Sequence, residues 1–197
     1  MNKRWTTTTV AFNRFAAIDF EIADYSYDSA CAISVVVIEK GNIIKNISDF
    51  IQPPRRSFIF SYLHGITWKD VAKKPKFEEL WPKINNILED VEFIAAHNAV
   101  FDRAVLNSCC AMVGIAPLNI PYLCTVKLSR HLWGIYPTKL SDVCRHFNIL
   151  HTHHNAESDA IVCAKIVLKA SVYGLPVDAF LAEVNMAHEK YYNRNIF

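Results

Sequence analysis

The sequence predicts an α/β fold in which a mixed five-stranded sheet is flanked by helices. Three observations lead to this prediction. Three apolar or β-branched segments fill residues 14–51 and are separated by short polar turns. Two further short apolar segments alternate with segments whose apolar residues recur at helical spacing. The chain after residue 125 is helical in pattern.

The first three strands are expected to form an antiparallel meander, and the last two to run parallel. Asn42 closes the turn signal Lys40-Gly41-Asn42, which separates the second strand from the third. The expected strands span residues 14–20, 31–39, 43–51, 92–96 and 121–126.

Helices are expected between and after the later strands. Residues 52–76 form a long surface excursion that contains a short helix, and Asn98 is a good N-cap for the helix that follows it. The other helices are expected at 77–90, 98–112, 125–133, 139–147, 156–171 and 177–191. Residues 1–175 would form one domain, and the helix within 176–197 either packs on the core or serves a homodimer.

Composition narrows the class of protein. Hydrophobic residues make up 52% of the 197 residues, enough for a full core. The sequence contains no run of about 18 apolar residues, so no membrane-spanning helix is expected. The N-terminus lacks the apolar region of a signal peptide. The six cysteines form no C-x-x-C pair and read as buried thiols in a reducing compartment, which indicates a cytoplasmic protein.

Two acidic side chains share one face at the end of the first strand. Successive strand side chains point to opposite faces, so Asp19 and Glu21 lie together while Phe20 points away. At about 4 Å and an effective dielectric near 20, their repulsion costs about 4 kcal/mol. A shared proton, a basic partner or a cation must offset this cost.

Two more aspartates lie at helix starts, Asp102 in AAHNAVFD and Asp159 in HTHHNAESDA. Each taken alone could simply satisfy a helix dipole. Taken together, four carboxylates at the ends of neighbouring elements suit Mg²⁺ or Mn²⁺, which prefer oxygen ligands. Two such ions can stabilise the attacking and leaving oxygens of a phosphoryl displacement, and a histidine is the usual base for the attacking water.

The stretches IDFEIAD, LHGITWKDV, AAHNAVFD and HHNAESDA, in this order, resemble the DnaQ-type (DEDDh) 3′–5′ exonucleases of the ribonuclease H-like fold. The resemblance implies that two ions, Mg²⁺ or Mn²⁺, are bound by Asp19, Glu21, Asp102 and Asp159. Of the histidines in HTHH, only His154 has the family's spacing to Asp159, so the resemblance implies that His154 takes the proton from the attacking water.

The resemblance also suggests substrate contacts. Phe20 and Leu63 would pack on the terminal sugar and base, and His64 would contact the terminal nucleotide. Ile22 would offer its backbone, although many relatives have threonine there. Core packing is the alternative for Phe20 and Leu63, and loop stabilisation is the alternative for His64. Asn98 is either a substrate contact or only a helix cap.

Charge agrees with a nucleic-acid substrate. The net charge of the chain is +2. If bound metal ions neutralise the four acids, the other residues together carry a charge of +6. Several basic residues are candidates to follow a phosphate backbone. They are Arg55, Arg56, Lys69, Lys73, Lys74, Lys76, Lys127, Arg130 and Lys139. The alternative is an ordinary lysine-rich surface loop, and this alternative is preferred for the lysines of residues 73–76.

The function expected from these motifs is release of nucleoside 5′-monophosphates from the 3′ ends of single-stranded DNA or RNA by a stand-alone enzyme. A proofreading subunit bound to a DNA polymerase is the first alternative. It is not favoured, because the only glutamine, Gln52, does not lie in a clamp-binding segment. A non-catalytic binding module would predict loss of a ligand, yet all five residues are present. A metal-binding HTHH tract is the remaining alternative.

Overall fold

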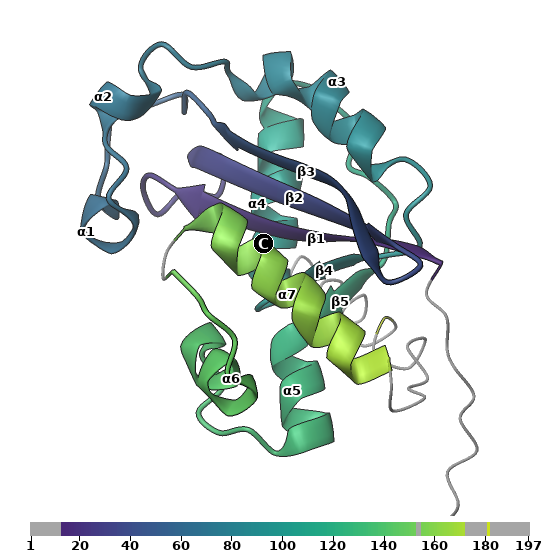
Figure 1. Ribbon diagram of the computed structural model, residues 1–197. Coiled ribbons are helices and arrows are strands. Elements are labelled where there is room, and N and C mark those ends of the chain that lie inside the picture. The colour runs from purple at the N-terminus through teal and green to yellow at the C-terminus, as the bar shows by residue number, and fades with distance from the viewer. Residues whose placement is uncertain (1–12, 153–154, 172–180, 182–197) are drawn as a thin grey trace, which may run out of the picture.

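Five strands form one mixed sheet, as the sequence predicts (Figure 1). The computed structural model describes residues 13–152, 155–171 and 181. The strands lie in the order β3-β2-β1-β4-β5. They are β1 Arg14–Ile22, β2 Ala30–Glu39, β3 Asn42–Phe50, β4 Ile94–Ala96 and β5 Tyr122–Cys124.

The pairing directions confirm the antiparallel meander and the parallel strands after it. β2 pairs antiparallel with both β1 and β3, and Asp19 of β1 lies opposite Ser34 of β2. β4 pairs parallel with β1 and with β5. Because β1, β4 and β5 run in the same direction, their carboxyl ends meet at one edge of the sheet. The Asp19-Phe20-Glu21 triplet lies at that edge.

β1 contributes to two different cores. Ala16, Ile18 and Phe20 pack with residues of the helices that cover one face of the sheet, whereas Phe15 and Ala17 pack with residues on the other face. Alternation along a strand therefore turns Asp19 and Glu21 to the same face as Phe15 and Ala17.

The helices divide between the two faces of the sheet. α7 crosses the face that carries Asp19 and contacts β1 to β4, while α3 and α4 lie on the opposite face (Figure 1). The longer helices are α3 Phe77–Leu88, α4 Ala99–Met112, α5 Thr125–Trp133, α6 Leu140–Phe147 and α7 Ala156–Ser171. Each begins within one residue of its expected start.

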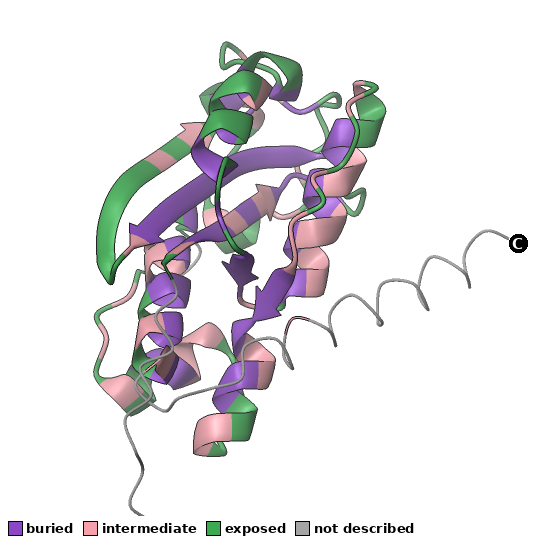
Figure 2. Ribbon diagram, turned by 90° about the vertical axis from the view of Figure 1, so that its right-hand side faces the viewer, coloured by how far each residue is buried: buried purple, intermediate pink, exposed green. Residues whose placement is uncertain are grey.

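The excursion predicted for residues 52–76 contains two single-turn helices, α1 Ser61–His64 and α2 Trp68–Val71. At the other end of the sheet, β4 and β5 are shorter than expected, with three residues each. Figure 2 shows the buried central strands beside β3, an edge strand that is largely exposed.

All six cysteines are buried as free thiols, as the sequence predicts. In the part of the chain that the structure describes, no helix combines the length and the apolar character that crossing a membrane requires. The expected helix at 177–191 lies outside the described residues apart from Leu181, which packs against the core that contains α7.

Asn98 occupies the N-cap position of α4, but it does not cap the helix in the expected way. Its side chain makes no capping hydrogen bond, and its backbone is left-handed, with φ of 77° and ψ of 53°. Asparagine adopts this left-handed conformation more readily than most residues other than glycine. The residue is therefore suited to the sharp turn from β4 into α4.

We expect Asn98→Ala to lower the free energy of unfolding by about 1–2 kcal/mol, because alanine is strained at positive φ. Asn98→Gly should be close to neutral, because glycine adopts this conformation freely. Urea unfolding of the two variants and the wild type measures the difference. Equal stability of the alanine and glycine variants would show that the left-handed turn does not select the residue.

Candidate active site

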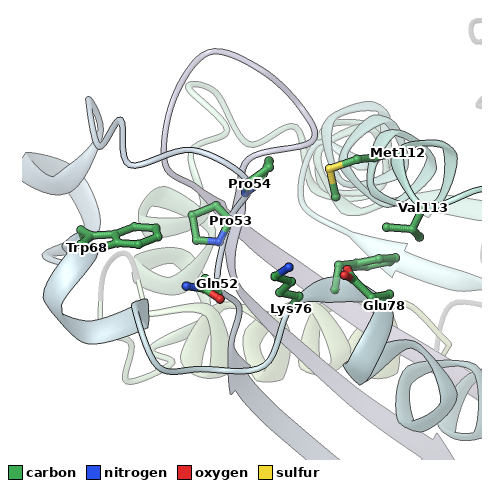
Figure 3. A pocket seen from close by; sticks show the side chains of 9 residues that line it. Gln52, Pro53, Pro54, Trp68, Lys76, Glu78, Met112 and Val113 are labelled. Atoms are coloured by element: carbon green, nitrogen blue, oxygen red, sulfur yellow. The ribbon is translucent and has the colours of Figure 1, made fainter.

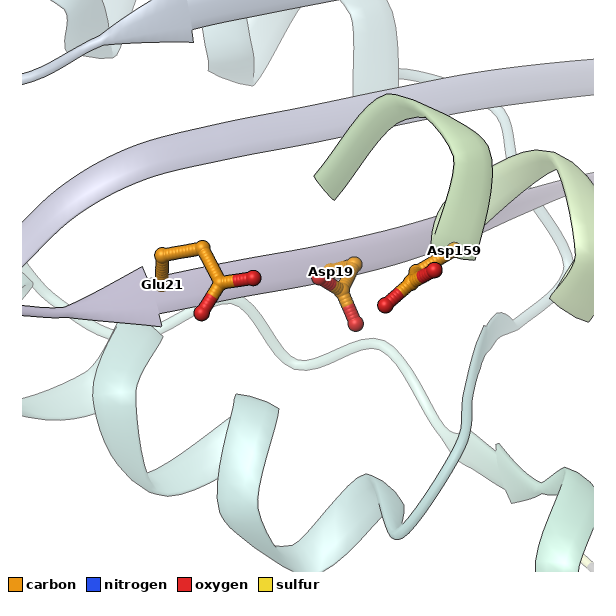
Figure 4. Close-up of side chains that lie close together, drawn as sticks. All are labelled: Asp19, Glu21 and Asp159. Atoms are coloured by element: carbon orange, nitrogen blue, oxygen red, sulfur yellow. The ribbon is translucent and has the colours of Figure 1, made fainter. Parts of the chain in front are cut away.

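Three carboxylates converge between the end of β1 and the start of α7. One oxygen each of Asp19, Glu21 and Asp159 can be chosen so that all lie within 4.8 Å of one another (Figure 4). Asp19 and Glu21 come from β1, and Asp159 comes from the first turn of α7. The sequence placed these residues at separate element ends, and the fold brings them together.

Asp102 completes the set from the opposite side of the sheet edge. It lies in the first turn of α4 and is only 2% exposed. Its Oδ1 accepts a hydrogen bond from the backbone N–H of Phe20, at 3.2 Å. This bond ties the start of α4 to the residue between Asp19 and Glu21.

The proximity of the acids is visible in their pKa values. Burial raises the pKa of Asp19 well above its usual range, and the charges of Asp102, Asp159 and Glu21 raise it further. Burial and the charge of Asp159 raise the pKa of Glu21 to about 7. Burial raises the pKa of Asp102 to about 8, although the hydrogen bond from Phe20 partly opposes this shift.

This donor set fits a hard divalent cation. Carboxylate oxygens are the ligands that Mg²⁺ and Mn²⁺ prefer, and a cation would offset both the burial and the mutual repulsion of the acids. Asp19, Glu21 and Asp159 could share one ion directly, and Asp102 lies close enough for its charge to act on them.

Two histidines lie beside the acids. His151 contacts the Oδ1 of Asp159 through its Nε2, and its side chain is 4% exposed. His97, at the end of β4, donates from Nε2 to the carbonyl of Thr138 and accepts from the hydroxyl of Thr125 at Nδ1, each at 2.9 Å. Burial, together with the charges of Arg130 and His151, lowers the pKa of His97 to about 4.

Sequence reasoning gave His97 no role in the site and left His151 as a loop residue or a phosphate-facing neighbour. His97 stands in the AAHNAVFD motif, which could have singled it out, and it joins β4 to α5 and to the segment before α6. His154, the residue expected to act as the base, lies outside the described residues.

An apolar hollow of about 200 Å³ adjoins Glu21. Its walls come from β1, from the segment around α1 and from α4. They are formed by Glu21, Ile22, Phe60, Leu63, His64 and Phe101. The structure thus places three of the expected substrate contacts, Ile22, Leu63 and His64, in one hollow. The side chain of Phe20 is 3% exposed and packs in the core on the other face of the sheet.

His64 joins α1 to the end of β1. Its Nδ1 accepts a hydrogen bond from the backbone N–H of Ile66 at 3.0 Å, so its Nε2 carries the proton. The Nε2 lies 3.2 Å from the carbonyl oxygen of Ile22 and donates to it. His64 therefore stabilises the loop in addition to lining the hollow.

Phe60 and Phe101 were not expected from the sequence. Tyr25 packs edge-on against Phe60, with ring centroids 4.9 Å apart, and Tyr27 packs edge-on against Phe101 at 5.9 Å. Both tyrosines belong to the turn between β1 and β2, so this turn supports two walls of the hollow.

Arg55 holds the same turn in place. It forms ion pairs with Asp24 and Asp28, with a distance of 3.1 Å from its Nε to Asp24 Oδ2. Burial alone would raise the pKa of Asp24, but the hydrogen bonds from Arg55 lower it below its usual value. Arg55 was a candidate to follow a phosphate backbone, and the structure instead pairs it with two carboxylates of the protein.

A separate hollow of about 410 Å³ lies between residues 52–54, the start of α2, the start of α3 and the end of α4 (Figure 3). Trp68 and Met112 are among its lining residues. It shares no lining residue with the carboxylate cluster, so we do not assign it to the reaction.

We expect the metal-free protein to lose stability as pH rises from 6.5 to 8. The folded protein then releases protons from Glu21 and Asp102, whereas the unfolded chain has already lost them. The resulting fall in the free energy of unfolding should be on the order of 2 kcal/mol. It should be smaller in Asp102→Asn, and added Mg²⁺ should stabilise the wild type more at pH 8 than at pH 6.5.

Urea unfolding at the two pH values, with and without Mg²⁺, tests this expectation. The Asp102→Asn variant is the control, because the cysteines and other titrating groups contribute equally to the pH dependence of stability in both proteins. If the free energy of unfolding of the wild type rose between pH 6.5 and 8 relative to that of Asp102→Asn, the raised pKa values of the cluster would be contradicted.

Comparison with known proteins agrees with this geometry. A family model described as exonuclease matches residues 16–167. The chain is 29% identical over 184 residues to a DNA polymerase III of PolC type from Clostridium perfringens, covering 91% of this chain and 12% of that protein. It is 31% identical over 162 residues to the 3′-5′ exonuclease DinG of Bacillus subtilis, covering 79% of this chain and 17% of that protein. The chain therefore spans only a small part of either relative.

Among solved structures, exonuclease X in complex with 5′ overhanging duplex DNA superimposes with a TM-score of 0.70 at 24% identity. The match covers 86% of this chain and 98% of that one, and it confirms the ribonuclease H-like fold. Since the family model spans most of the chain, and the four acids of the DEDDh pattern are present in order, the chain belongs to the exonuclease family, in its DnaQ-type (DEDDh) branch.

Proposed function

We propose that this chain removes nucleotides from the 3′ end of single-stranded nucleic acid, releasing nucleoside 5′-monophosphates with the help of two divalent ions. The observation that carries the proposal is the convergence of Asp19, Glu21 and Asp159 within 4.8 Å, with the buried Asp102 beside them. The direction of digestion is supported by the relative named as a 3′-5′ exonuclease.

Each acid has a part in this reaction. Asp19, Glu21, Asp102 and Asp159 would hold the ions, which are Mg²⁺ or Mn²⁺ by the chemistry of the donor set. When bound, the ions supply charge that stabilises the attacking and leaving oxygens of the displacement. The N–H of Phe20 fixes the orientation of Asp102, so the acid from α4 is held in place before substrate arrives. His154 is proposed to take the proton of the attacking water.

The apolar hollow beside Glu21 is proposed to hold the 3′-terminal nucleoside. Leu63 and Phe101 offer apolar and aromatic surface to a base, and stacking of this kind does not depend on the sequence of the substrate. Ile22 and His64 also line the hollow, and the hydrogen bond between them fixes their positions. For Phe20 the burial of its ring favours a backbone role over contact with the sugar.

Asn98 stays a proposed substrate contact. It is exposed at the turn before α4 and could meet the substrate near Asp102, but its left-handed backbone already explains the residue type. The preference for single-stranded substrate and cytoplasmic localisation also stay proposals, the latter supported by the buried free thiols.

A role in polymerase proofreading is the second candidate, because a PolC-type DNA polymerase III is among the relatives. The chemistry of the site would be the same in both cases. Stand-alone action, the function expected from the sequence motifs, stays the first candidate. A homodimer is compatible with either role.

Asp102→Ala should abolish digestion, because it removes a carboxylate from the proposed metal centre. The assay uses matched single-stranded DNA and RNA oligonucleotides labelled at the 5′ end, with Mg²⁺, Mn²⁺ or EDTA. The wild type should give a metal-dependent ladder that shortens from the 3′ end. The variant should lose at least about a thousandfold in rate, while remaining folded.

Glu89→Ala, which removes an exposed acid at the end of α3, is the matched control and should keep full activity. Wild-type turnover by Asp102→Ala would refute the metal-site assignment. Immediate release of the labelled 5′ nucleotide would refute the direction of digestion.

Phe101→Ala should raise KM by about 5- to 150-fold, with a smaller effect on kcat, because base stacking on an aromatic side chain contributes about 1–3 kcal/mol. Steady-state kinetics on a short oligonucleotide give both constants. Tyr136→Ala removes an aromatic side chain that is 72% exposed and does not line the hollow, so it should leave KM unchanged. An unchanged KM in Phe101→Ala would place the terminal base elsewhere.

A further inference from the structure

His151 is the described histidine that touches an acid of the cluster. Its Nε2 contacts Oδ1 of Asp159, and its side chain is 4% exposed compared with 13% for that of Asp159. A polar ring buried this deeply against one carboxylate is costly to desolvate unless the contact is a hydrogen bond. The spacing that singled out His154 gave no reason to expect this contact.

The chain on both sides of His151 is anchored. Before it, the backbone N–H of Ile149 donates to the carbonyl of Cys144 in α6 at 2.9 Å. After it, the backbone N–H of Thr152 donates to the hydroxyl of Ser158 in α7 at 3.0 Å. The ring is therefore held at a fixed place relative to the start of α7.

The start of α7 is itself fixed by Asn155. The side-chain Oδ1 of Asn155 accepts from the N–H of Ser158 at 2.9 Å, and its carbonyl accepts from the N–H of Asp159 at 2.9 Å. The backbone of Asp159 is thus set by the helix cap. The contact with His151 restricts the rotation of its carboxylate about the side-chain bonds.

His151 contacts the cluster through a single acid, Asp159. Neither of its ring nitrogens belongs to the group of atoms from Asp19, Glu21 and Asp159 that lie within 4.8 Å of one another. A ring nitrogen that donates its proton to a carboxylate has no lone pair left to bind a metal ion. Residues in this position orient a metal ligand without binding the metal themselves.

We propose that His151 is a positioning residue that donates its Nε2–H to Oδ1 of Asp159 and so orients this carboxylate toward the cation site. The inference rests on the proposed function, because it assumes that the acids bind divalent ions. Two histidines of HTHH then have different roles. His151 sets the affinity for the metal ion, and His154 takes part in the proton transfer.

The test measures Mn²⁺ binding without nucleic acid, by calorimetry and by the thermal shift that Mn²⁺ produces. His151→Ala should weaken Mn²⁺ binding by about 10- to 100-fold, the usual effect of losing a partner of a metal ligand. His151→Gln should stay within about threefold of the wild type, because the glutamine amide carries a donor as far along the side chain as Nε2. His151→Asn has a shorter reach and should resemble His151→Ala.

Two further variants complete the design. His154→Ala should bind Mn²⁺ like the wild type, and so should His146→Ala, which removes an exposed histidine of α6. In digestion assays, the Mn²⁺ concentration that gives half-maximal rate should rise in His151→Ala, and the rate at saturating Mn²⁺ should largely recover. A metal-free melting temperature close to that of the wild type shows that the comparison is made between folded proteins.

Wild-type Mn²⁺ affinity in His151→Ala would overturn the inference and leave the proposed function standing. Equal weakness of His151→Gln and His151→Ala would also overturn it, because the donor would then not be what matters. A wild type that binds no Mn²⁺ would overturn the metal centre and this inference together.

Discussion

The crowding of four carboxylates at one sheet edge is the constraint on which the rest of this structure depends. The pKa values of Asp19, Glu21 and Asp102 lie above the ordinary range, because burial and mutual repulsion both disfavour charge. The surrounding groups hold the acids in place against this repulsion. The N–H of Phe20 binds Asp102, and the cap of α7 and His151 fix Asp159. The site is therefore organised by backbone and neighbouring side chains before any cation is added.

Much of the fold and half of the site follow from local rules that a sequence reveals. The alternation of β1 predicted that Asp19 and Glu21 share a face, because a strand has a fixed period of two. The predicted helix starts located Asp102 and Asp159 in the first turns of their helices. The order of the motifs in the chain then led to the correct family.

The parts that sequence reasoning missed depend on contacts between distant segments. Phe60 and Phe101 meet in one hollow although three helices and one strand separate them along the chain. Arg55 was expected to face phosphate, yet it pairs with Asp24 and Asp28, which lie on another turn. The contact of His151 depends on the path of the loop before α7, and residue spacing alone does not determine such a path.

β1 shows what it means for one strand to serve two purposes at once. Its even-numbered residues pack in the core against α3 and α4, and its odd-numbered residues include the acids that face α7. A deletion or insertion of one residue within β1 would exchange the two sets, burying charge in the core and presenting Phe20 to the substrate. Change in this strand is thus restricted to substitutions, while the turn after Glu21, where the pairing with β2 becomes irregular, is the nearest place where the chain could gain or lose length.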